Sequence, residues 1–244
     1  MPASQSVPTV SVRPPAWRSE GTRISDPGAP IPARIDLSAP HRGIVLTDGN
    51  AEPDELLGLH LTSGCELVDS WLRGDDVTAV YQSADGRTLR STAMWRVHPM
   101  AAPARSWELV ASAQTTLLET HPRVSVVSSV AADEILWAAV GAGPITWGSS
   151  QTGRSPCVLL RRRRPGPLPT SILLVAHPAD TAGLSVTVRG PRVSVECGLF
   201  PEMLEKGVLV RSRLLAAVGP TQHAAAWAER LVAAFLAAPP VLTT

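Results

Sequence analysis

The chain has 244 residues, with 44% hydrophobic side chains, 18% charged side chains and a formal net charge of +1. This composition is typical of a globular protein with a buried core. The near-neutral charge argues against general binding to nucleic acid or to an anionic membrane. Lys206 is the only lysine among 22 basic residues, a bias that is typical of a GC-rich bacterial genome.

The start of the sequence carries no targeting pattern. Residues 1–12 lack a basic start followed by an apolar stretch, so no secretory signal is expected. No apolar run is long enough for a membrane span, which needs about 18 or more such residues. We therefore expect a cytoplasmic protein. The three cysteines (Cys65, Cys157 and Cys197) are widely spaced, which favours reduced buried thiols but leaves one disulfide open.

In chain order, residues 1–33 come first and are rich in Pro, Ser and Ala. Such a segment has few large apolar groups to offset the entropy of ordering it. We predict a flexible or extended Pro-rich tail, which Trp17 could anchor on the surface. Residues 34–244 are then expected to form a single β-rich domain.

From Arg34 onward, short runs with period-two alternation are separated by Gly, Pro and Asp, as is typical of strands. The runs that predict strands are 43–47, 66–72, 77–82, 88–97, 107–117, 124–130, 157–161, 171–176, 184–188, 193–197 and 207–218. Residues 134–140 are one continuous apolar run, which is compatible with a strand or a helix. Turns are expected at residues 73–76, 85–86 and 189–192.

The chain ends in a predicted helix at residues 221–238. Thr221 can cap its start, and Pro239 and Pro240 stop it. An apolar stripe recurs at helical spacing, and it consists of Ala224, Trp227, Ala228, Leu231, Phe235 and Leu236. We expect this stripe to pack against a sheet.

Many short strands without alternating helices predict a mainly β fold, namely a large antiparallel β-sandwich with one C-terminal α-helix. The β-rich length, the tryptophans, and the acids and histidines at strand ends resemble large antiparallel sandwiches that bind sugars, including the mutarotase-like supersandwiches. The resemblance is one of architecture and rests on no specific motif. It implies a small saccharide as a ligand to be tested.

Seven tryptophans against two Phe and one Tyr are the most unusual feature of the composition. Exposed indole rings stack on sugar faces, whereas buried ones fill a core in place of Phe. Core packing is the more frequent use, and in particular the ring of Trp95 is expected to face inward. The candidate ligand-binding set is Trp71, Trp95, His98 and Trp107.

Three His-Pro pairs place His98, His121 and His177 at strand ends, where loops gather. An imidazole with nearby carboxylates can act as an acid–base pair. The candidate catalytic set is His177, Asp180, Glu202, Glu205 and Lys206. The alternative is that these residues belong to strand ends and solvated turns, where an ion pair contributes little.

The sequence contains no phosphate-binding glycine loop, dinucleotide fingerprint, nucleophile elbow or HExxH motif. No cofactor and no metal are therefore expected. Two hypotheses remain, and neither fixes the oligomeric state. The preferred one is a non-catalytic β-sandwich that binds a ligand, such as a saccharide, or serves as an interaction module. The alternative is a carbohydrate-active enzyme of epimerase or lyase type.

Overall fold

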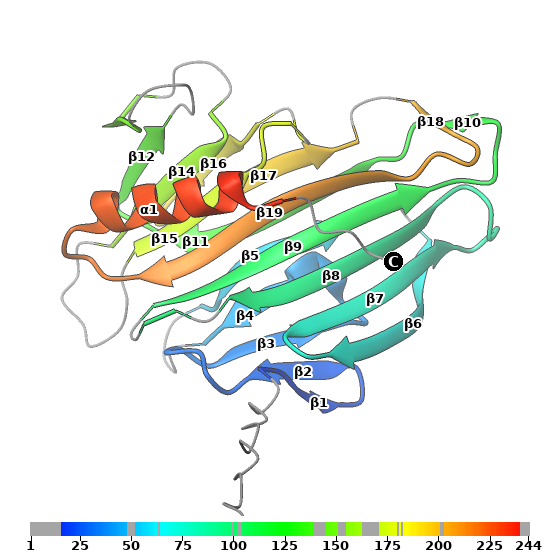
Figure 1. Ribbon diagram of the computed structural model, residues 1–244, viewed down its shortest axis with the longest axis horizontal. Coiled ribbons are helices and arrows are strands. Elements are labelled where there is room, and N and C mark those ends of the chain that lie inside the picture. Colours follow the sequence, from blue (N-terminus) through cyan, green and yellow to red (C-terminus); the bar gives the residue numbers. More distant parts are fainter. Residues whose placement is uncertain are drawn as a thin grey trace, which may run out of the picture.

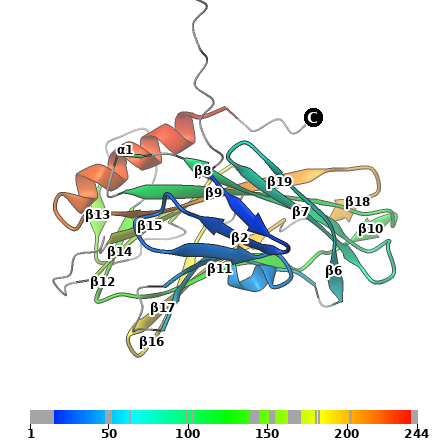
Figure 2. The same cartoon turned by 90° about the horizontal axis from the view of Figure 1, so that it is seen from below.

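Two antiparallel β-sheets stack face to face, and one C-terminal helix covers part of the larger sheet (Figures 1 and 2). The computed structural model describes residues 16–47, 52–62, 64–98, 100–101, 104–138, 145–150, 155–162, 171–179, 181, 183–200 and 203–239. This arrangement confirms the predicted mainly β fold with antiparallel sheets and a single C-terminal helix.

The first sheet, sheet A, has eight strands. Their spatial order is β1 (Arg18–Glu20), β2 (Arg23–Asp26), β3 (Ala33–Asp36), β4 (Ile44–Leu46), β5 (Asp54–His60), β11 (Val124–Ala131), β17 (Arg192–Leu199) and β16 (Ser185–Arg189). A short 3₁₀ helix, η1 (Pro40–Arg42), connects β3 to β4. The predicted turn at residues 189–192 is a two-residue hairpin, because Arg189 pairs with Arg192.

The second sheet, sheet B, has nine strands and carries the helix. Their order is β13 (Trp147–Gly148), β12 (Glu134–Ala138), β14 (Cys157–Arg161), β15 (Ser171–Ala176), β19 (Val210–Gly219), β9 (Arg105–Gln114), β8 (Arg90–His98), β7 (Asp76–Ser83) and β6 (Cys65–Arg73). The ambiguous run at 134–140 is thus a strand as far as residue 138. A separate two-stranded pair joins β10 (Glu119–Thr120) to β18 (Leu204–Glu205).

The main core lies between the two sheets and follows from the alternation within each strand. Inward residues of sheet B, such as Trp95 and Trp107, meet inward residues of sheet A, such as Ile35 and Leu56. Both tryptophans are 0% exposed. Burying side chains of this size removes a large apolar area from water, so these rings are a main contribution to the core.

Helix α1 (Ala224–Ala237) lies on the outer face of sheet B, over β14, β15 and β19 (Figure 1). Trp227, Val232 and Phe235 are its large buried side chains, and they form a second core with the sheet. The predicted helix is therefore confirmed with a later start. His223, rather than Thr221, is the N-cap residue. No helix among the described residues has the length and apolar character needed to cross a bilayer.

Of the predicted tail at residues 1–33, residues 1–15 lie outside the described residues, whereas residues 18–20 and 23–26 form strands of sheet A. Trp17 is 1% exposed, and its Nε1 donates a hydrogen bond to the carbonyl of Asp75 at 2.9 Å. Strands β1 and β2 pair with each other, and β2 pairs with β3. The segment is ordered because a buried indole and sheet hydrogen bonds offset the conformational entropy that is lost when it folds. Its composition alone suggested that this entropic cost would be the larger effect.

Candidate functional site

The outer face of sheet B has two parts in the portion of the chain that the structure describes. Over β14, β15 and β19 it is apolar and is covered by α1. Over β6, β7, β8 and β9 it carries polar side chains and has no covering element (Figure 1). Successive residues of a strand point to opposite faces, so every second residue of these four strands lies on the uncovered part.

The uncovered part forms a groove of about 790 Å³. Trp71 of β6 lies on its lining and is 46% exposed. Thr78 of β7 is its direct cross-strand neighbour. Further side chains able to form hydrogen bonds follow across the floor, namely Thr92, Ser112 and Gln114. The groove therefore combines one exposed indole with a row of hydroxyl and amide groups.

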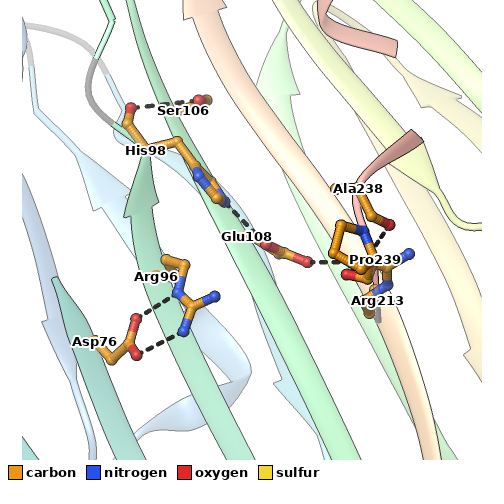
Figure 3. A network of polar contacts seen from close by, with 8 residues as sticks. All are labelled: Asp76, Arg96, His98, Ser106, Glu108, Arg213, Ala238 and Pro239. Atoms are coloured by element: carbon orange, nitrogen blue, oxygen red, sulfur yellow. Dashed lines mark hydrogen bonds and ion pairs between the residues drawn. The ribbon is translucent and has the colours of Figure 1, made fainter. Parts of the chain in front are cut away.

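Positive charge dominates the lining. Among the described residues, four arginines and one acid line the groove, and they are Arg73, Arg90, Arg96, Arg211 and Asp76. Four positive charges less one negative charge leave an excess of three. Asp76 pairs with Arg96 through two hydrogen bonds of 2.7 and 2.8 Å (Figure 3). The hydrogen bond to Asp76 raises the pKa of Arg96, so this guanidinium stays charged.

A second polar network lies between the groove and the helix (Figure 3). The imidazole Nε2 of His98 is 2.9 Å from Oε2 of Glu108, and Oε1 of Glu108 is 3.9 Å from Nη1 of Arg213. Arg213 Nη1 also donates to the carbonyls of Ala238 and Pro239, at 3.5 and 3.1 Å. A cation at the carbonyl end of a helix is favoured by the helix dipole, so this network secures the end of α1.

The structure divides the predicted ligand-binding residues among three environments. Trp71 lines the groove. Trp95 and Trp107 lie in the core, the packing that the sequence favoured, and present no surface to a ligand. His98 is on the outer face, but its ring is held against Glu108. One of the four candidates therefore lies on the lining of the groove.

The predicted catalytic residues that the structure describes lie apart. His177 follows β15, where its backbone N–H donates to the carbonyl of Arg213 and its ring packs edge-on against Phe235. Glu205 and Lys206 precede the first residue of β19, beside β10. Asp180 and Glu202 lie outside the described residues.

The histidine corners also lie apart. His98 pairs with Ser106 at the start of β9, whereas His121 follows β10, beyond the other end of β9. A strand rises about 3.4 Å per residue, so the backbone of β9 between its two ends spans roughly 25 Å, and the two histidines lie toward opposite ends of it. These two histidines cannot act on the same small substrate.

The three cysteines are free thiols. Burial raises the pKa of Cys157 to about 12 and that of Cys197 to about 11. Burial also raises the pKa of Cys65. Reactive cysteines have the opposite shift, because the thiolate is the nucleophile. Among the described residues, no group of three or more His, Cys, Asp or Glu side chains is arranged to hold a metal ion.

Comparison with protein-family models and with curated proteins gives no match for this sequence. The groove must therefore be interpreted from its own residues. Its arginines were not among the sequence candidates, yet a signal for them exists. Arg90, Thr92, Met94 and Arg96 are spaced two apart in one strand, which puts them on one face.

Proposed function

We propose that the protein is a non-catalytic β-sandwich that binds a saccharide in the groove on the outer face of sheet B. The observation that carries the proposal is the exposed indole of Trp71 beside a row of hydrogen-bonding side chains. An indole ring offers a flat apolar surface that matches the C–H face of a sugar ring. Thr92 and Gln114 would then hydrogen-bond to the sugar hydroxyl groups.

The charge of the groove favours an acidic saccharide over a neutral one. Arg73 and Arg90 lie in the lining in addition to the Arg96–Asp76 pair. Guanidinium groups bind carboxylates and sulfates through two parallel hydrogen bonds. A uronic acid or sulfated oligosaccharide would satisfy both the indole and the arginines, so these are the ligands to test first.

The test is a binding screen on the full chain, with neutral, uronic acid and sulfated oligosaccharides as probes. Thermal unfolding gives the first readout, because a ligand at about 100 times its Kd stabilises the folded state by about 2.7 kcal/mol. Isothermal titration calorimetry then gives the Kd. We expect the acidic probes to bind more tightly than the neutral ones and to lose affinity as salt is added.

Two variants locate the site. Trp71→Ala should weaken binding at least tenfold, and Arg90→Gln should weaken the acidic probes selectively. Leu118→Ala is the matched control, because Leu118 is an apolar side chain that is 84% exposed and does not line the groove. If no saccharide binds, or if Trp71→Ala binds as well as Leu118→Ala does, the proposal is wrong.

A further inference from the structure

Strand β6 is the last strand of sheet B, and no described strand pairs with its outer side. It is nine residues long and leaves Val68, Trp71 and Leu72 exposed by 52%, 46% and 39%. A long edge strand with exposed apolar side chains is a template for pairing with another strand. We propose that β6 of a second copy is that strand, and that the two copies form one continuous antiparallel sheet across a two-fold axis.

A β-bulge determines which residues of β6 share a face. The pairing with β7 is regular except for a register shift between Leu67 and Asp69. Glu66 pairs with Gln82, and Arg73 pairs with Asp76. Gln82 and Asp76 are an even number of residues apart in β7, so they lie on one face. Glu66 and Arg73 therefore also share a face, although an odd number of residues separates them.

This shared face makes β6 complementary to itself. With Val68 kept in its bulge, a two-fold pairing centred on Ser70 matches all seven remaining positions of residues 66–73. Every cross-strand pair then joins two residues of the same face. The pairs are Ser70–Ser70, Asp69–Trp71, Leu67–Leu72 and Glu66–Arg73, each of the last three formed twice.

Charge selects this register. Glu66 and Arg73 are exposed, and neither forms an ion pair with the described residues of its own chain. Opposite charges directly across an antiparallel pair stabilise it, and like charges destabilise it. Moving the centre toward residue 69 would place Asp69 opposite Asp69. Moving it to residue 71 would pair Asp69 with Arg73 but would leave Glu66 without a partner, so the register centred on Ser70 is the one that pairs both Glu66 and Arg73.

The same charges protect the edge from other strands. An uncharged strand that added to β6 would leave Glu66 without an opposite charge, and an acidic strand would repel it. Charged side chains on an edge strand commonly prevent such pairing. A second copy in the two-fold register is the partner that matches both Glu66 and Arg73. The inference shares Trp71 and Arg73 with the proposed saccharide groove, but it rests on strand pairing at the edge of the sheet, so its test needs no saccharide.

Sedimentation velocity of the full chain tests the proposal over a range of about 1 to about 300 µM, the range in which a weak dimer dissociates. We expect a dimer that forms with increasing concentration. Glu66→Arg and Arg73→Glu should each weaken it at least tenfold, because each places like charges opposite one another. The double variant Glu66→Arg/Arg73→Glu should restore it, because the exchanged charges are again opposite.

Two further measurements separate dimerisation from folding and from general charge. An equal mixture of the two single variants should form dimers, since one chain then has a positive charge at both positions and the other a negative charge at both. Arg189→Glu is the matched control, because Arg189 is exposed on β16 at an edge of sheet A. A wild-type chain that is monomeric throughout overturns the proposal. So does a double variant that stays monomeric, or an Arg189→Glu chain that is weakened as much as Arg73→Glu.

Discussion

The carboxylate of Asp26 and the guanidinium of Arg105 form a two-pronged ion pair inside the sandwich, with N–O distances of 2.8 and 2.6 Å. The side chain of Asp26 is 0% exposed and that of Arg105 is 9% exposed. The same carboxylate accepts a hydrogen bond from Nε1 of Trp107 at 3.0 Å and one from the backbone N–H of Gly28. The pair ties β2 of sheet A to β9 of sheet B.

Asp26→Asn should therefore destabilise the fold strongly. The amide leaves the guanidinium of Arg105 buried without a counter-charge, which costs about 3 kcal/mol or more in such pairs. Urea unfolding followed by fluorescence measures the change in the free energy of unfolding. Glu20→Gln makes the same carboxylate-to-amide change on an exposed part of β1 and should stay within about 0.5 kcal/mol of the wild type. Equal effects of the two variants would show that the ion pair does not stabilise the fold.

The surroundings of this ion pair show which parts of the fold can be predicted from the sequence and which cannot. The strands from β6 to β9 were predicted within a few residues because their alternation and turns are local signals. That residues 16–33 have a defined structure depends instead on distant contacts, such as those of Asp26 with Arg105 and Trp107. No composition of the segment itself reveals such partners, so a Pro- and Ser-rich stretch was predicted as a tail.

The candidate site divides in the same way. Trp71 was selected because its residue type suits a ligand surface, and it lies in the groove. Trp95 and Trp107 have the same chemistry, but they face the core, and the parity of each strand decides which face is buried. Arg211 joins the groove from β19, which is adjacent to β9 through a long crossover. Periodicity within one strand contains no information about that neighbour.

Replacing Arg213 should loosen the end of α1. Arg213→Met removes the hydrogen bonds to the carbonyls of Ala238 and Pro239, and it leaves Glu108 buried beside an apolar side chain. We expect a loss of about 3 kcal/mol in the free energy of unfolding. The substitution should increase the rate of hydrogen exchange more in the last turn of α1 than in β19, because the helix end opens locally.

Two further variants show whether the effect comes from the network. Arg230→Met, at an exposed position of α1, should leave both readouts unchanged. Glu108→Gln combined with Arg213→Met should cost less than the sum of the two single changes, because the buried carboxylate that has lost Arg213 is then absent. Additive losses would mean that Glu108 and Arg213 act separately.

The thiols should react in two classes. Burial raises the pKa of Cys157 to about 12 and that of Cys197 to about 11, so both are protonated and shielded at neutral pH. Cys65 is partly exposed at the start of β6. An aromatic disulfide reagent at about pH 8 should therefore modify one thiol per native chain and three per unfolded chain. Cys65→Ser should abolish the native reaction, and a native reaction that persists in this variant would contradict the assignment.

The stability of the protein should decrease when the medium becomes acidic, in part because of His60. Partial desolvation of its ring, followed by the nearby His41, lowers the pKa of His60 from its usual 6.5, although Glu196 and Glu55 act in the opposite direction. The two imidazole rings are 6.1 Å apart and meet edge-on. Since the unfolded chain binds this proton more readily than the folded chain, His60 favours folding above about pH 6.5 and loses that contribution as the pH falls.

His60→Gln removes the proton-binding group and should make the free energy of unfolding less dependent on pH between about 7 and about 5. Urea unfolding at several pH values measures the slope for each protein. His121→Gln makes the same substitution at a position far from His41 in the sequence and serves as the matched control. A His60→Gln slope equal to the wild-type slope would mean that the partial desolvation of His60 and its contact with His41 do not make the fold sensitive to acid.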